Sequence, residues 1–126
     1  MGTTTNITPQ ALAAYRTTMQ QRGEQDKKAR QERQKLAHQI AHQASKLLKE
    51  EFDVTKVVLF GSLAHQHWFS HSSDIDLAVW GLTKSDYFLA VARLQELSTE
   101  FKIDLVDINN CSVSLYQVIQ REGQIL

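Results

Sequence analysis

Apolar residues follow two different spacings along this chain of 126 residues. Between residues 31 and 51 they recur every three or four positions, which predicts an amphipathic helix packed on the rest of the domain. Further upstream, Thr8 and Pro9 mark an earlier helix start. The stretch 20–35 is almost wholly polar, so it either continues as a solvent-exposed helix or hinges near Gly23.

A separate apolar patch lies near the N-terminus, and it consists of Ala11, Leu12, Tyr15 and Met19. The polar stretch that follows leaves this patch without an obvious place in the core. A partner chain or a second copy of the protein is the simplest surface to cover it, and folding back onto its own domain is the alternative. We therefore expect a homo-oligomer to be able to form through the N-terminal helical segment.

The second half of the chain contains short apolar runs that predict strands, at 57–60, 73–79 and 101–108. The second of these runs begins with Ser73 and Asp74, so the predicted strand covers 73–79. Helical spacing returns between residues 85 and 99, and a last helix is expected after Ser112 or Ser114. Strands joined by helices predict an α+β fold, a small mixed β-sheet with helices packed on one face. We divide the chain into an N-terminal helical extension, residues 1–50, and a core domain, residues 51–126.

Carboxylates interrupt the predicted strands. Asp74 and Asp76 are two positions apart, so their side chains point to one face and their Cα atoms lie roughly 6 to 7 Å apart. Like charges this close repel unless a cation neutralises them, and Mg²⁺ suits such a pair. Asp104 and Asp107 are three positions apart and face opposite sides of the third strand. Only one of them can join the pair, and spacing alone leaves both open.

A Gly-Ser step follows the first strand. Gly61 gives the backbone freedom to turn sharply. We expect Ser62 to cap a short helix, whose free N–H groups would then hold an anion such as a phosphate.

Together, these motifs resemble a known family. Gly61-Ser62, followed by Ser73-Asp74-Ile75-Asp76 and an aspartate on a third strand, looks like the nucleotidyltransferase superfamily that includes the DNA polymerase β-like enzymes. The resemblance covers residues 50 to 126. The short length resembles its minimal members, the MNT proteins, which are often paired with a HEPN protein as a toxin-antitoxin system.

The resemblance implies a nucleotidyltransferase fold and a role for each motif residue. Gly61, Ser62 and Ser73 would bind the nucleotide, while Asp74, Asp76 and Asp104 would be catalytic and would bind two Mg²⁺ ions. The reaction it implies is transfer of a nucleoside monophosphate, AMP for preference, from ATP or another nucleoside triphosphate to an acceptor hydroxyl. The acceptor would be a tyrosine of a HEPN-type partner protein, which makes this chain an antitoxin.

Two positions depart from the family pattern. The family commonly has Arg directly after Gly-Ser and Gly four residues beyond the Ser, where this chain has Leu63 and Gln66. Loss of a basic side chain near the phosphates favours an alternative, a binding antitoxin that masks its partner without chemistry. A second alternative is a nucleotidyltransferase that acts on a small molecule.

Charge is distributed unevenly although the net charge is zero. Residues 1 to 49 carry nine Lys or Arg against three Asp or Glu, and residues 50 to 126 carry five against eleven. The two parts are therefore complementary, or the first contacts an acidic partner. Acidic residues interrupt the basic ones, so we expect no direct nucleic-acid binding. The sequence shows neither a membrane span nor a secretory signal, and we expect a cytoplasmic protein.

Overall fold

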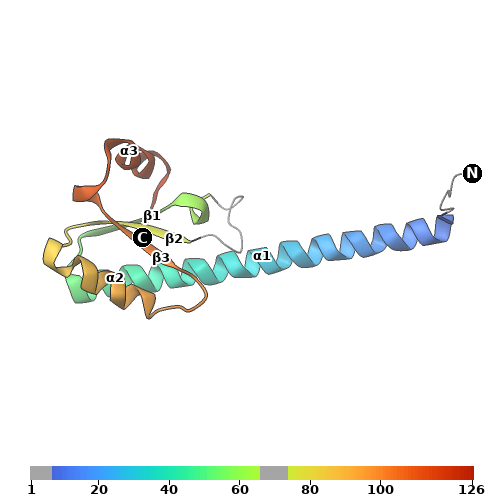
Figure 1. Cartoon of the computed structure of the whole chain (residues 1–126), viewed down its shortest axis with the longest axis horizontal. Helices are drawn as coiled ribbons and strands as arrows, with labels where there is room; N and C mark the ends of the chain where they lie inside the picture. The colour runs from blue at the N-terminus through green and yellow to red at the C-terminus, as the bar shows by residue number, and fades with distance from the viewer. Residues whose placement is uncertain (1–6, 66–73) are drawn as a thin grey trace, which may run out of the picture.

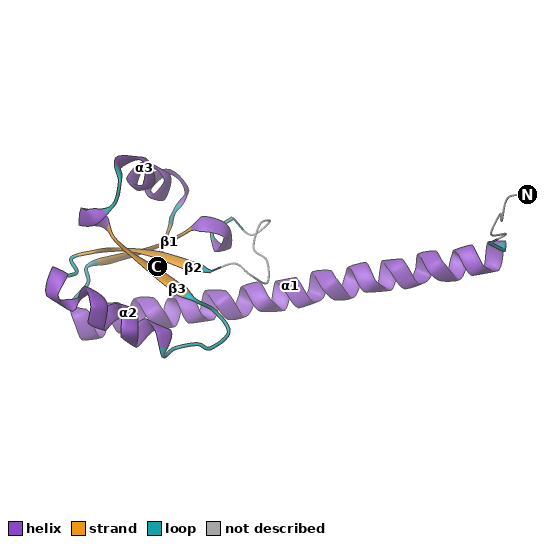
Figure 2. Ribbon diagram, viewed as in Figure 1, coloured by secondary structure: helices purple, strands orange, loops and turns teal. Residues whose placement is uncertain are grey.

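The computed structural model describes residues 7–65 and 74–126, which form three α-helices and a four-stranded mixed sheet (Figures 1 and 2). In chain order the elements are α1 (Pro9–Phe52), β1 (Lys56–Phe60), β2 (Ile75–Trp80), α2 (Tyr87–Gln95), β3 (Ile103–Asp107), α3 (Val113–Glu122) and β4 (Gln124–Ile125). Short 3₁₀ turns follow β1 (η1, Gly61–Leu63), precede α2 (η3, Lys84–Asp86) and follow β3 (η4, Ile108–Asn110). The predicted α+β class is confirmed.

The strands lie in the order β3-β2-β1-β4. β1 runs antiparallel to both of its neighbours, whereas β2 and β3 are parallel. The sequence predicted the first three strands to within a few residues. It gave no signal for β4, because two residues are too few to show an alternating pattern.

α1 is one continuous helix of 44 residues. Thr8 caps its N-terminus by accepting a hydrogen bond from the Ala11 N–H at 3.1 Å, and Pro9 occupies the first turn as predicted. Of the two alternatives for the polar stretch 20–35, the exposed helix is correct. Figure 1 shows the N-terminal part of α1 extending well beyond the sheet. The proposed division at residue 50 runs through the last turn of this helix and stays a prediction.

Two apolar clusters sit on opposite faces of the sheet. The last turns of α1 and the helix α2 cover the face that carries Val57, Leu59 and Leu77. On the other face a smaller cluster joins the sheet to α3, and it contains Val58, Phe60, Ala78, Ile108 and Ile119. α1 and α2 therefore share one face of the sheet as expected. α3 packs on the opposite face and forms a thinner layer there.

β3 is an edge strand whose outward carbonyls are covered by side chains of α2. The Tyr87 hydroxyl donates to the Leu105 carbonyl and the Gln95 side-chain amide donates to the Ile103 carbonyl, both at 2.7 Å. These contacts protect the edge from pairing with another strand. No helix in the described ranges is both long and apolar enough to cross a membrane.

Candidate active site

The turn after β1 depends on Gly61, whose φ is 75°. Glycine adopts this left-handed conformation without strain. Because the chain turns at Gly61 itself, Ser62 lies inside the 3₁₀ turn η1, and Phe60 is the residue that precedes the turn, without a side-chain cap. The prediction that Ser62 caps a short helix is therefore wrong.

The carboxylates of β2 and β3 meet on the face that α3 partly covers. Asp76 stands opposite Phe60 on β1 and opposite Asp104 on β3. Residues in register on neighbouring strands share a face, with strands about 4.8 Å apart. Asp74 directly precedes β2 and lies near enough to Asp104 for that carboxylate to raise its pKa. The structure thus brings these three aspartates together at the start of two parallel strands.

Charge and burial oppose ionisation at this cluster. Burial, followed by the charges of Asp104 and Asp74, raises the pKa of Asp76 to about 6. Burial first, then the charge and the hydrogen-bonding contact of Asp104, also raises the pKa of Asp74, while Lys102 acts in the opposite direction. The site therefore holds more negative charge than its surroundings stabilise.

Asp107, the other candidate on β3, lies on the opposite face. It is 6% exposed and accepts hydrogen bonds from the Asn109 N–H at 3.1 Å and from the Asn110 side-chain amide at 3.4 Å. These bonds cap the turn η4. The sequence left open which of the two aspartates joins the pair. In the structure Asp104 lies beside Asp76, whereas Asp107 stabilises the turn η4.

One basic residue near the carboxylates was missed by the sequence analysis. The Lys102 ammonium lies 3.6 Å from the Asp104 carboxylate. They are two positions apart along an extended segment, so their side chains share a face. The same alternation that grouped Asp74 with Asp76 could have identified Lys102.

The segment after η1 is only partly described. Leu63, which stands where the family commonly has Arg, is fully buried in the larger core cluster. His65 contacts Glu122 of α3 at 3.1 Å. The predicted nucleotide-binding residue Ser73 and the departure at Gln66 lie outside the described residues.

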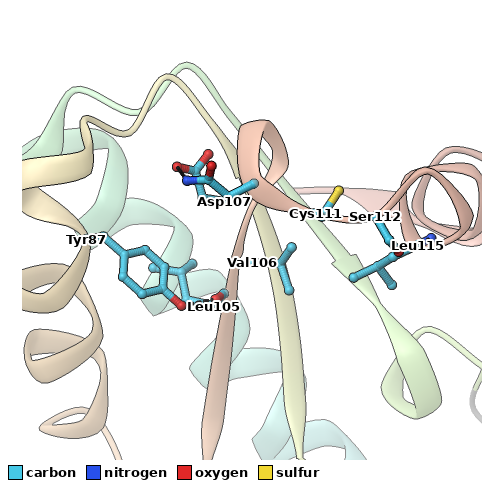
Figure 3. A pocket seen from close by; sticks show the side chains of 8 residues that line it. Tyr87, Leu105, Val106, Asp107, Cys111, Ser112 and Leu115 are labelled. Atoms are coloured by element: carbon cyan, nitrogen blue, oxygen red, sulfur yellow. Dashed lines mark hydrogen bonds between the residues drawn. The ribbon is translucent and has the colours of Figure 1, made fainter.

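A cavity of about 490 Å³ opens along the outer side of β3, between α2 and the start of α3 (Figure 3). Its lining residues are Tyr87, Leu105, Val106, Asp107, Asn110, Cys111, Ser112 and Leu115. Tyr87 comes from α2, whereas Cys111, Ser112 and Leu115 lie on the opposite side of the cavity (Figure 3). The cavity is adjacent to the strand that carries Asp104.

The carboxylate cluster has the donor chemistry of a magnesium site. Three aspartates supply hard oxygen ligands, and a divalent cation would relieve the repulsion that raises the pKa of Asp76. As the side chains stand in residues 7–65 and 74–126, no three His, Cys, Asp or Glu residues converge closely enough to hold one ion. The residues fit Mg²⁺ by type and charge, and binding would require the carboxyl groups to turn toward a common point.

The second positions of the paired strands β2 and β3 are Asp76 and Asp104, beside the Gly61-Ser62 turn, which agrees with the nucleotidyltransferase resemblance of the sequence. A family model described as "Polymerase beta, Nucleotidyltransferase" matches residues 42–126. The chain belongs to this polymerase β nucleotidyltransferase family.

Several solved structures are similar to this chain. A toxin-antitoxin crystal structure with AMP-PNP has 26% identity and a TM-score of 0.58, and the match covers 68% of this chain and 70% of that one. A mutant of the toxin-antitoxin pair MntA-HpeT has 27% identity and a TM-score of 0.56, over 68% and 69% of the two chains. A complex of a tri-AMPylated Shewanella oneidensis HEPN toxin with an MNT antitoxin, at 24% identity and a TM-score of 0.54, shares the fold over 71% and 70%. No curated protein matches the chain.

Proposed function

We propose that this protein is an Mg²⁺-dependent nucleotidyltransferase that moves AMP from ATP to a hydroxyl group of a HEPN-type partner protein, as the antitoxin of the pair. The observation that carries the proposal is the register of Asp76 with Asp104, with Asp74 immediately before β2. Burial and mutual repulsion oppose the ionisation of these carboxylates. Such groups are unfavourable for folding and are typical of functional sites.

Each site residue has a role in this proposal. Asp74, Asp76 and Asp104 would hold Mg²⁺, and the Gly61–Ser62 turn would lie against the triphosphate, with Ser73 as a further nucleotide contact. Bound Mg²⁺ would neutralise phosphate charge and lower the pKa of the attacking hydroxyl. The three carboxylates would orient the ions relative to the acceptor, and the bound cations would offset the repulsion among them.

The partner and the nucleotide are proposed from the relatives. One similar toxin-antitoxin structure contains AMP-PNP, an ATP analogue, and another contains a HEPN toxin that carries AMP groups. An AMP group on a HEPN tyrosine would place a bulky charged group at that toxin's surface and so silence it.

One observation favours a second candidate, a binding antitoxin that acts without chemistry. Leu63 is buried in the core at the position where a family Arg would approach the phosphates. A fully buried leucine makes no contact with a triphosphate, so the site has one basic group fewer. In that case the carboxylates would be left over from a catalytic ancestor, and the protein would neutralise its toxin by binding over its surface.

The test is transfer of label from ATP labelled at its α-phosphate, with Mg²⁺, to a HEPN-type protein encoded beside this one. The double variant Asp74→Asn, Asp76→Asn is the comparison, because it keeps side-chain shape and removes charge. We expect label on the partner with the wild-type chain only. The same variants tested for rescue of cells from the toxin connect the chemistry to the function.

The outcomes separate the candidates. Loss of both labelling and rescue in the double variant supports the transferase. Rescue that survives in the double variant, with the partner still bound and no label from any nucleoside triphosphate, contradicts it and supports the binding antitoxin.

A further inference from the structure

The N-terminal part of α1 has no counterpart in the family match, which begins at residue 42. We call residues 9–32 the arm, because every one of them is exposed. At 1.5 Å per residue the arm is about 36 Å long. Gly23 in its interior weakens the helix by about 1 kcal/mol relative to alanine. Packing of an apolar face is the main source of helix stability in proteins, so a partner surface would stabilise the arm.

The arm carries an apolar stripe with a basic border. Leu12, Tyr15 and Met19 follow the spacing i, i+3, i+7 and are 38%, 62% and 47% exposed. Arg16 and Arg22 flank the stripe, and no acidic residue of the arm precedes Glu24. Two stripes packed against each other would bring four arginines together without a counter-charge, which disfavours that pairing. The complementary surface is apolar with an acidic border.

Farther along the same helix this chain presents a groove of mixed polarity, with three apolar residues and two glutamates among its lining. The groove, of about 410 Å³, lies between α1 and the segment after α2, lined by Leu36, Gln39, Ile40, Gln43, Glu96, Leu97, Ser98, Thr99 and Glu100. Leu36 remains 37% exposed in it. Glu100 stands at its border, and Glu32 lies one helical turn before Leu36 along α1. Its apolar residues and acidic border match the stripe of the arm in chemistry.

We propose that two copies of this chain pair through antiparallel α1 helices, so that the arm of each copy lies in the groove of the other. The register follows from the stripe. With Tyr15 opposite Gln39 of the second copy, between Leu36 and Gln43, the aromatic ring enters the groove. Moving seven residues along one helix means moving seven residues back along its antiparallel neighbour, so Arg22 then stands opposite Glu32.

The symmetry of this arrangement uses each contact twice. In this register a two-fold axis crosses the pair at Lys27 of each helix, so both grooves are filled and both Arg22–Glu32 pairs form. Tyr15, Arg22, Ala29 and Leu36 recur every seven residues, which keeps them on one seam as the helices wind around each other. The pairing leaves the carboxylate face near α3 uncovered, and it is independent of the proposed transferase activity.

The first experiment measures the mass of the full chain by size-exclusion chromatography with light scattering over a range of concentrations. We expect a dimer, and we expect Tyr15→Glu with Met19→Glu to raise its dissociation constant roughly 100-fold or more, because each buried apolar side chain contributes a factor of about ten or more. The matched control is Thr17→Glu with Gln20→Glu, which adds the same charge on the outer face of the arm and should leave the dimer intact.

The second experiment tests the register by charge reversal. Arg22→Glu or Glu32→Arg alone should weaken the dimer about threefold to tenfold, and the two together should restore it. Circular dichroism checks that each variant keeps its folded domain. A wild-type monomer at every concentration overturns the proposal. So does a dimer that survives Tyr15→Glu with Met19→Glu, or a double reversal no tighter than the single variants.

Discussion

Gly61 and Asp76 are in such close contact that the Asp76 carboxylate occupies the space where a side chain on Gly61 would begin. A Cβ atom added at Gly61 would overlap the carboxylate oxygen and lie 3.1 Å from its Cγ. The φ of 75° independently requires glycine at this position. The turn that follows β1 and the first residues of β2 are thus fitted to each other, and the turn fixes where the carboxylate can lie.

This relationship predicts that Gly61→Ala disrupts the position of the Asp76 carboxylate, although the substitution adds only one methyl group. The added methyl group must displace the Asp76 carboxylate, and the backbone must hold a left-handed conformation that costs about 1 kcal/mol or more. We expect a loss of thermal stability of that order and a loss of nucleotidyl transfer. Thermal unfolding and label transfer from ATP measure the two effects.

Gly23→Ala is the matched control, because a Cβ atom at Gly23 has no neighbour within 4 Å. This glycine lies in the middle of α1, where alanine should stabilise the helix by about 0.5 to 1 kcal/mol. Equal loss of transfer in both variants would show that the contact between Gly61 and Asp76 has no special importance.

The two aspartates of β3 should respond differently to the same change. Asp104→Asn removes a carboxylate beside Asp76, and we expect transfer to fall on the order of 100-fold with little effect on folding. Asp107→Asn weakens the cap of the turn η4 and should cost about 1 kcal/mol of stability with transfer preserved. Transfer rates and urea unfolding of both variants test this, and the reverse result would assign the third carboxylate to Asp107.

The sequence predicted the strands, the α+β class and the grouping of Asp74 with Asp76, because alternation along a strand is a local property. It left Asp104 and Asp107 undecided, since their separation depends on which face of β3 meets which helix. It also placed Ser62 wrongly, because the φ of Gly61 sets where the turn begins. Lys102 was within reach of the same alternation and was overlooked.

Metal binding should appear as a stabilisation that depends on the carboxylates. A ligand at ten times its dissociation constant stabilises the folded state by about 1.4 kcal/mol, or a few degrees for a chain of this size. We expect Mg²⁺ with a non-hydrolysable ATP analogue to raise the melting temperature of the wild type and of Asp107→Asn. The variant Asp74→Asn, Asp76→Asn should show no rise, and an equal rise in it would place the ion elsewhere.

The raised pKa of Asp76 predicts a pH dependence of stability in metal-free buffer. Its pKa is about 6 in the folded protein and 3.8 in an ordinary environment, so between these values the folded state binds the proton more strongly than the unfolded state does. The contribution of Asp76 to the free energy of unfolding therefore declines as pH rises from about 4 to about 6 and is level above. The raised pKa of Asp74 adds a decline in the same direction.

Asp76→Asn removes this cost, so the variant should unfold less readily than the wild type at pH 7.5, by about 1 to 2 kcal/mol after allowance for the solvent that reaches the carboxylate. Below pH 4 the two should be alike. Asp104→Asn should flatten the wild-type decline only in part, because it removes one neighbouring charge and leaves the burial that is the largest cause. Urea unfolding across pH measures all three chains. A wild-type stability that rises between pH 4 and pH 6, with Asp76→Asn less stable at pH 7.5, would mean that the carboxylate is stabilised where it lies.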